Sequence, residues 1–285
     1  MFLGLNQGIF EYADIPIEES LRKIAKYGFR YIDYSTKKSS DPTTMSKSRR
    51  KEVIEIFRGE QFICSQLLML ETKDLATADR KRSREVFDYM RRCAEFQIEI
   101  GGKHVLICWG AGIRQFGMSK EEAWRNSVSM IRKFCQWAQT LNVVASIEMD
   151  PHVYFVVNDL SAMVRIIEEV EMPNLFANID IGHLHISREE PMRMEKLSRK
   201  ILHAHLSDTD SFNHTNDILG TGIVNFDSYI EKLRKIGIEE NCRRINEPCV
   251  ATIEIGSRGR VDDPDRWIRE SLSHIRLTVP VLQMK

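Results

Sequence analysis

Four apolar stretches decide the fold of this chain: VVASIEMDP (143–151), LFANIDIGH (175–183), ILHAHLSD (201–208) and VATIEIG (250–256). Each carries, near its end, a side chain that can bind a hard metal ion, and these are Glu148, Asp180, His205 and Glu254. Three carboxylates and one imidazole suit an oxygen-preferring divalent ion such as Mn²⁺ or Mg²⁺ better than a structural zinc. A (β/α)₈ barrel would bring such strand ends together at one mouth.

Strand-like and helix-like stretches alternate along the whole chain. Earlier strands are predicted at 2–7, 29–35, 62–70 and 104–110, and helices near 17–28, 44–59, 77–99, 119–141, 158–171, 188–200, 226–236 and from 264 onward. Ser119 with Glu122, and Asp263 before Pro264, mark two of the helix starts. Such alternation predicts parallel strands with helical crossovers. The stretch after the first strand, LNQGIFEY, lacks the Gly-rich turn of an open doubly wound sheet. We therefore expect one closed barrel domain over residues 1–285.

Strand parity places the candidate ligands on a shared interior face, because residues i and i+2 of a strand point the same way. The pairs are Ser146 with Glu148, Asn178 with Asp180, His203 with His205, and Thr252 with Glu254. Taken singly, each ligand would more often be a helix cap, a solvated loop residue or a hydrogen-bonded core histidine. Together, four costly polar groups at equivalent strand ends predict one metal site. His203 lies one layer deeper and is expected to hydrogen bond a ligand or a neighbouring strand.

Composition bounds the class of protein. Lysine plus arginine and aspartate plus glutamate both total 41, and this balance argues against a dedicated nucleic-acid binder. The basic cluster SKSRRK (46–51) is interpreted as a solvated helix face rather than a phosphate-binding patch. No uncharged apolar run approaches the roughly 20 residues of a membrane span, and the N-terminus lacks a positively charged leader region. The six cysteines form no CxxC pair. We expect a cytoplasmic protein with buried, reduced thiols and no membrane partner.

These motifs make the chain resemble the xylose-isomerase-like barrel superfamily, in its branch of sugar isomerases, 3-epimerases and inosose dehydratases. Glu148 matches the glutamate that ends strand five in this branch, and Glu254 in TIEIG matches the one that ends strand eight. Asp180 and His183 in DIGH match its D-x-x-H motif. His205 in HAHLSD matches the metal-binding second histidine of its H-x-H motif. The GTG at 220–222 resembles its G-x-G before helix seven, while the first half of the chain matches mainly in rhythm.

The resemblance implies one divalent ion, Mn²⁺ by preference with Mg²⁺ or Co²⁺ as alternatives, bound by Glu148, Asp180, His205 and Glu254. The ion would hold a carbonyl oxygen and a neighbouring oxygen of a sugar and stabilise the enediolate formed on proton loss. Glu148 and Glu254 would take and return the proton from opposite faces of the carbon. His183 would bind the substrate, although a histidine at a helix end can also simply cap a carbonyl.

The chain departs from this branch at one position that bears on the substrate. Ketose 3-epimerases place an arginine six residues after the strand-seven histidine, where this chain has Ser211. Arg258 and Arg260 in GSRGR are alternative substrate-binding groups, and a solvated loop is their plainer interpretation. His152, just beyond strand five, is a further candidate catalytic base; a loop histidine that only hydrogen bonds is the competing interpretation.

We therefore predict a metal-dependent isomerase or epimerase. Its small-molecule partner would be an unphosphorylated sugar or keto-sugar substrate. The alternative is a lyase that uses the same proton abstraction to expel water from an inosose or the aglycone of an oxo-glycoside. An apurinic endonuclease would need further ligands from strands two to four, whose ends IDYS, LLML and ICWG offer little. A metal-free binding barrel is a last alternative. A homo-oligomer or a partner subunit is compatible with each of these.

Overall fold

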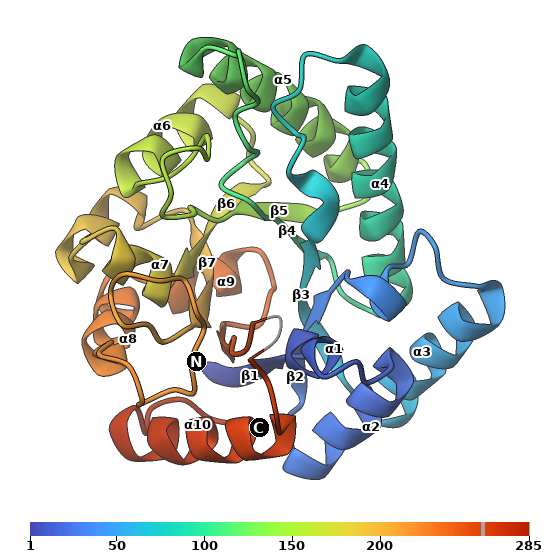
Figure 1. Ribbon diagram of the computed structural model, residues 1–285, viewed down its shortest axis with the longest axis vertical. Helices are drawn as coiled ribbons and strands as arrows, with labels where there is room; N and C mark the ends of the chain where they lie inside the picture. The colour runs from blue at the N-terminus through green and yellow to red at the C-terminus, as the bar shows by residue number, and fades with distance from the viewer. Residues whose placement is uncertain (258–259, 285) are drawn as a thin grey trace.

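Eight parallel strands close into a barrel in the order β1 to β8, with β1 paired to both β2 and β8 (Figure 1). This computed structural model describes residues 1–257 and 260–284. The strands are β1 (Phe2–Asn6), β2 (Tyr31–Ser35), β3 (Ile63–Met69), β4 (His104–Ile107), β5 (Val144–Ile147), β6 (Leu175–Asp180), β7 (Ile201–Leu206) and β8 (Val250–Ile253). The predicted (β/α)₈ fold is confirmed.

Helices form a ring outside the strands, as Figure 1 shows. Those that match the predicted crossovers are α2 (Ile17–Tyr27), α3 (Lys47–Gly59), α4 (Arg80–Glu99), α5 (Lys120–Gln139), α6 (Leu160–Val170), α8 (Phe226–Lys235) and α10 (Pro264–Thr278). The predicted caps are present. Ser119 accepts a hydrogen bond from the backbone N–H of Glu122, and Asp263 accepts one from that of Arg266. Short 3₁₀ helices η1 (Lys38–Ser40) and η2 (Leu70–Thr72) follow β2 and β3.

The prediction of an α-helix over 188–200 is wrong. A short helix, α7 (Ile181–Ile186), begins directly after β6 because the Asp180 side chain caps it. Pro191, which has no N–H to donate, then starts the 3₁₀ helix η3 (Pro191–Leu197). Two further short helices, α1 (Gly8–Tyr12) and α9 (Ile238–Arg244), were also missed, because both are shorter than the window over which helical periodicity can be recognised.

The main apolar core lies between the strands and the helices rather than inside the barrel. Strand residues such as Leu5 and Ile32 are fully buried in it. The barrel interior instead contains buried polar side chains. His104 Nε2 lies 2.5 Å from Ser146 Oγ and 3.2 Å from Gln66 Nε2. Bulky aliphatic residues dominate most barrel interiors. A hydrogen-bonded polar interior therefore indicates that these residues support the polar groups at the mouth.

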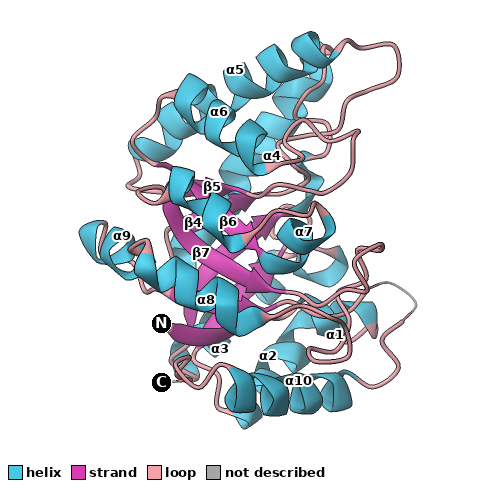
Figure 2. Ribbon diagram, turned by 90° about the vertical axis from the view of Figure 1, so that its left-hand side faces the viewer, coloured by secondary structure: helices cyan, strands magenta, loops and turns pink. Residues whose placement is uncertain are grey.

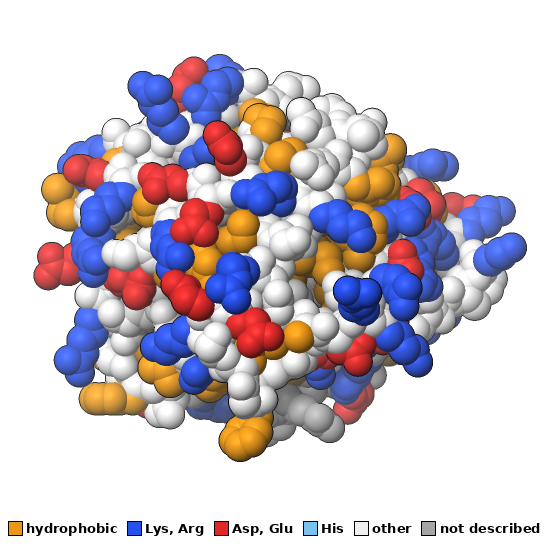
Figure 3. Space-filling model, turned by 90° about the horizontal axis from the view of Figure 1, so that it is seen from above, with side chains coloured by type: hydrophobic (Ala, Val, Ile, Leu, Met, Phe, Trp, Pro, Cys, Tyr) orange, Lys and Arg blue, Asp and Glu red, His pale blue; other side chains and the backbone are white. Residues whose placement is uncertain are grey.

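The long strand-to-helix connections gather on the side to which the strand arrows point in Figure 2, and both termini lie on the opposite side. Residues at the carboxyl ends of β5 to β8 therefore share one mouth. On the face seen in Figure 3, basic and acidic side chains are interspersed and form no single-sign field. None of the described helices is both long and apolar enough to cross a membrane. All six cysteines are buried, and none forms a disulfide.

Candidate metal centre

Glu148, Asp180, His205 and Glu254 converge at the mouth of the barrel, each offering one ligand atom within 4.8 Å of the other three. Register explains part of this, because Asp180 of β6 pairs directly with His205 of β7. Glu148 follows the last residue of β5, and Glu254 follows that of β8. His205 Nδ1 lies 2.9 Å from Glu148 Oε1 and 2.6 Å from Glu254 Oε2. The four residues predicted from strand parity therefore form one cluster.

Two asparagines hold the glutamates in place. Asn178, which shares the interior face of β6 with Asp180, donates to Glu148 Oε1 at 2.6 Å. Asn6, the last residue of β1, donates to Glu254 Oε1 at 2.9 Å. Each glutamate is thus oriented by an amide from a neighbouring strand. Such supporting contacts keep ligand atoms in position without satisfying all of their acceptor capacity.

Asp180 has one carboxylate oxygen that is available to a cation. Its Oδ1 accepts hydrogen bonds from Ser207 Oγ at 2.5 Å and from the backbone N–H of His183 at 2.9 Å. Its Oδ2 is buried and accepts no hydrogen bond from the described residues. A buried carboxylate oxygen without a partner is costly. The donor set and this unused oxygen both fit a hard divalent ion.

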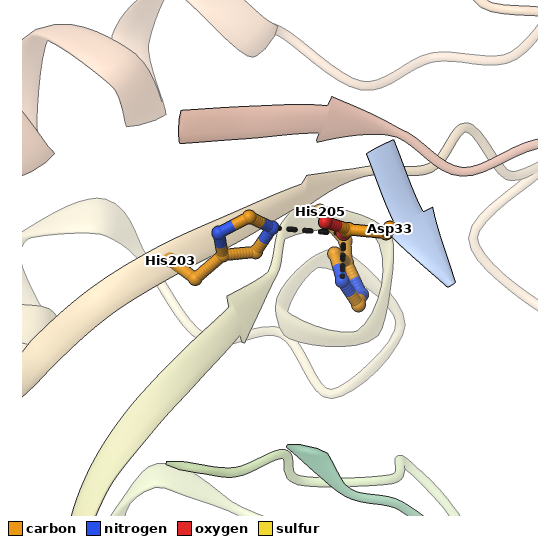
Figure 4. A group of neighbouring side chains, drawn as sticks. All are labelled: Asp33, His203 and His205. Carbon is orange, nitrogen blue, oxygen red and sulfur yellow. Dashed lines mark hydrogen bonds and ion pairs between the residues drawn. The ribbon is translucent and has the colours of Figure 1, made fainter. Parts of the chain in front are cut away.

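The opposite nitrogen of His205 contacts residues from the first half of the barrel. His205 Nε2 lies 3.2 Å from Asp33 Oδ2 on β2 (Figure 4) and 3.1 Å from Gln66 Oε1 on β3. Both oxygens are acceptors, so Nε2 carries a proton, and Nδ1, which faces Glu148 and Glu254, would bind a metal in place of a second proton. His203 lies deeper, with Nε2 2.8 Å from Asp33 and 3.1 Å from Thr252 Oγ1.

Asp33 was not singled out from the sequence, although a signal was present. A single carboxylate in the strand YIDYS is the same kind of costly buried charge as those of the later strands. Ser65 Oγ donates to its Oδ1 at 2.6 Å. Burial opposes ionisation of Asp33, but His203 and His205 outweigh this effect and hold its pKa below the usual value. Strand two therefore contributes more to the site than its sequence indicated.

The pKa values of the candidate metal ligands are shifted because several carboxylates are buried close together. Burial raises the pKa of Glu148 to about 7, although His205 opposes the shift. Burial also acts to raise the pKa of Glu254, but the nearby His205 outweighs it and the net pKa is lowered. For His205 itself, burial disfavours the charged ring, yet Glu254 and Glu148 raise its pKa well above the usual value. A divalent cation would neutralise this excess of carboxylates.

A solvent-open pocket of about 110 Å³ lies against the cluster and includes Glu148 and Glu254 in its wall. Most other wall residues are polar or aromatic, namely Tyr12, Trp109, Asp150, His183, His214 and Asn216, and Leu68, Leu70 and Cys108 complete the wall. Asp150, His183 and His214 also bring one ligand-type atom each within 4.8 Å of one another. Burial raises the pKa of the Asp150 carboxyl well above its usual value. Asp150 shares strand parity with Glu148 and could have been noticed. His214 lies in a loop, where no periodic signal exists.

His183 lies in this pocket wall, but both of its ring nitrogens have protein partners. Nδ1 donates to the backbone carbonyl of Met149 at 2.7 Å, and Nε2 lies 2.7 Å from Nε2 of His214. Burial lowers the pKa of His183 to about 4, so the ring is neutral near pH 7. The sequence analysis gave two interpretations of His183: a substrate-binding group, or a histidine that only contacts a carbonyl. The bond to the Met149 carbonyl matches the second interpretation, and the contact with His214 was not expected.

The remaining predicted residues are placed differently. The His152 ring stacks on Tyr154 and Phe155, at centroid distances of 5.5 and 6.2 Å, and makes no hydrogen bond with the described residues. It is not in the pocket wall. Arg258 falls outside the described residues. Arg260 pairs with Asp217 at 2.7 Å. Ser211 occupies the position at which ketose 3-epimerases have an arginine, and its Oγ lies 2.8 Å from His185 Nε2.

Comparisons with known proteins agree with the barrel fold. The family model of the xylose isomerase-like TIM barrel matches residues 21–278. A fructoselysine 3-epimerase of Escherichia coli O157:H7 is 21% identical over 209 residues, which cover 73% of this chain and 72% of that protein. The solved structure of the IolI protein with a bound zinc atom has a TM-score of 0.80 at 18% identity, covering 99% of both chains. A D-psicose 3-epimerase from Clostridium cellulolyticum H10, solved with D-tagatose, has a TM-score of 0.79 at 15% identity, covering 99% of this chain and all of that one.

Proposed function

Since the chain belongs to the xylose isomerase-like TIM-barrel family, we propose that it is a divalent-metal-dependent isomerase or epimerase of an unphosphorylated sugar or keto-sugar. The observation that carries this proposal is the convergence of Glu148, Asp180, His205 and Glu254 at the barrel mouth. The likeness to a fructoselysine 3-epimerase supports the same reaction class.

The ion would be held by these four side chains, and we propose Mn²⁺, with Mg²⁺ or Co²⁺ as alternatives. Three oxygen donors and one nitrogen donor favour such ions, whereas structural zinc sites favour sulfur and nitrogen. When bound, the ion would act as a Lewis acid that stabilises negative charge on the substrate oxygens. Asp33 and Gln66 hold the proton of His205 on Nε2, which keeps Nδ1 directed at the ion.

Glu148 and Glu254 would move the proton. They extend from β5 and β8, which are separated by two other strands of the barrel, and so can approach a substrate carbon from different sides. One carboxylate removes the proton next to the carbonyl, and the other returns a proton to the same carbon with inverted configuration, or to its neighbour in an isomerisation. Asn178 and Asn6 fix the orientation of the two carboxylates. Positioning of this kind lowers the entropic cost of proton transfer.

A lyase remains the second candidate, and one observation favours it. Trp109 lies in the pocket wall and stacks on Phe155 at a centroid distance of 6.4 Å. The Phe155 ring in turn contacts the rings of His152 and Tyr154. Trp109, the member of this aromatic cluster that lies in the pocket wall, would pack against an aromatic leaving group. In an elimination the same proton removal would be followed by loss of water or of an aglycone from the adjacent carbon.

Solvent exchange separates these reactions. Metal-loaded protein in D₂O would be incubated with ketoses such as D-fructose and D-tagatose, with inososes and with oxo-glycosides, and products followed by ¹H NMR. We expect deuterium at the carbon next to the ketose carbonyl and altered stereochemistry, both abolished by a chelator. Release of aglycone or of a dehydrated product would favour the lyase. Exchange into none of these compounds would refute both proposals.

A further inference from the structure

The connection between β7 and α8 is a loop, yet it is firmly anchored beside the metal cluster. The Asp208 carboxylate accepts hydrogen bonds from the backbone N–H groups of Gly220 at 2.8 Å and Gly222 at 3.0 Å. A Cβ at Gly222 would lie 2.3 Å from Asp208 Oδ1, which explains why this GTG segment requires glycine there. Asp217, further along the loop, pairs with Arg260. The loop is thereby closed on itself and tied to the segment that follows β8.

Two side chains of this loop reach the pocket. His214 and Asn216 are both in its wall, together with Glu148 and Glu254. Asn216 adopts a positive φ of 45°, an uncommon backbone conformation for a residue with a side chain. Its Oδ1 is buried and accepts no hydrogen bond from the described residues. A strained residue with an unpaired buried acceptor next to a pocket indicates a group that a ligand satisfies.

The rings of His183 and His214 differ in which of their nitrogens remain available to a ligand. His183 is occupied at Nδ1 by the Met149 carbonyl and at Nε2 by His214, so it has no nitrogen left for a ligand. Because a carbonyl can only accept, His183 Nδ1 carries a proton, and the neutral ring accepts at Nε2. His214 then donates from Nε2. Its Nδ1 is an acceptor that no hydrogen bond within the described residues uses.

We propose that His214, supported by His183, and Asn216 bind hydroxyl groups of the substrate of the proposed reaction. Two acceptors on one anchored loop suit the O–H donors of a neutral polyol. The other wall residues extend this selectivity, because Glu148, Asp150 and Glu254 are acidic and no lysine or arginine belongs to the described part of the wall. A phosphorylated or carboxylated sugar would find no cationic side chain among the described residues of this wall to pair with its charge. His214 thereby takes over the substrate contact that the sequence motif assigned to His183.

Steady-state kinetics of three variants would test this assignment. The substrate would be the neutral ketose into which the wild-type protein incorporates deuterium most rapidly. His214→Gln keeps a donor near the position of Nε2 but loses the Nδ1 acceptor, and His214→Asn keeps an oxygen near Nδ1. We expect His214→Gln to raise KM about tenfold, the scale of one lost hydrogen bond of about 1.4 kcal/mol, with kcat and metal content little changed. His214→Asn should raise KM less. Asn213→Ala, an exposed neighbour in the same loop, is the matched control and should match wild type.

A second measurement does not depend on activity. ¹⁵N-histidine NMR of the full-length, Mg²⁺-loaded protein should show the proton on Nδ1 of His183 and on Nε2 of His214. D-tagatose should shift the His214 ring while D-fructose 6-phosphate at the same concentration should not. If wild type exchanges deuterium but His214→Gln has an unchanged KM, the inference fails while the proposed function stands. If wild type exchanges nothing, the function fails, and the NMR titration alone decides the binding role.

Asp150, His183 and His214 bring one ligand-type atom each within 4.8 Å of one another, so a second cation, for which His183 would have to give up a ring contact, is the competing occupant. Metal analysis distinguishes this case. One ion per chain, retained in His214→Gln, supports the hydroxyl-binding role. Two ions per chain, with one lost in that variant, would overturn it.

Discussion

Asp33→Asn is the sharpest test of how the structure holds the metal centre. Asp33 has no predicted contact with the ion, and its Oδ2 instead lies 3.2 Å from Nε2 of His205. Asparagine has the same shape but no charge, and its amide nitrogen cannot accept the His205 proton. The substitution therefore weakens the contact that holds the Nε2 proton and directs His205 Nδ1 at Glu148 and Glu254, while the side-chain volume stays nearly the same.

The expected magnitude follows from one charge-assisted hydrogen bond. Such bonds contribute about 1.5–3 kcal/mol, and removing an outer partner of a metal-binding histidine weakens metal affinity by about 10–100-fold. A tenfold change corresponds to about 1.4 kcal/mol, so the two ranges agree. Gln66 Oε1, 3.1 Å from the same nitrogen, can still accept and favours the lower half of the range. We expect Asp33→Asn to weaken Mn²⁺ binding by about 10–30-fold.

Competition with a chromophoric chelator at fixed pH would measure this affinity, and circular dichroism would check the fold. Ser65→Ala is the matched control, because Ser65 donates to the other Asp33 oxygen at 2.6 Å and its removal leaves the Asp33 charge in place. The control should change Mn²⁺ affinity by less than about threefold. Wild-type affinity in folded Asp33→Asn would refute the proposed support of His205.

Three further predictions concern the ligands, the reaction and stability. Glu254→Gln should sharply lower both metal content and activity, since it removes a ligand charge; full metal occupancy measured by elemental analysis would contradict the four-ligand site. His152→Ala with intact metal should cost about tenfold or less in an isomerase, whereas a loss above about a hundredfold would indicate a catalytic acid or base and elimination chemistry. Arg49 binds both carboxylate oxygens of Glu18, at 2.7 and 2.9 Å, and lowers its pKa. The stability from this pair is therefore present above the pKa of a free glutamate, about 4.3, and is lost as pH falls below it. Arg49→Ala should lower the free energy of unfolding by about 0.5 kcal/mol at pH 7 and leave it unchanged near pH 2, as measured by urea denaturation; an equal difference at both pH values would contradict this.

Much of the candidate metal cluster followed from local patterns. Glu148, Asp180, His205 and Glu254 could be found because each is a polar residue at the end of an apolar strand, and parity showed which face it shares. The error over 188–200 has a local cause too. A helix of only six residues, α7, precedes Pro191, and neither it nor the following 3₁₀ helix produces a long periodic signal. Residues whose role depends on a loop, such as His214, had no pattern to reveal them.

The sequence by itself determined the order of strands and helices and the side of each strand that carries polar groups, because both depend on spacing along a few consecutive residues. Only the tertiary structure decided which groups meet across the barrel. Asp33 reaches His203 and His205, about 170 positions away, only because the sheet closes on itself. Register shifts between Ile32 and Asp33 and between Ala177 and Asn178 adjust the strands that carry these contacts. Such shifts, like the meeting of His183 with His214, arise from packing between distant segments and leave no periodic trace in the chain.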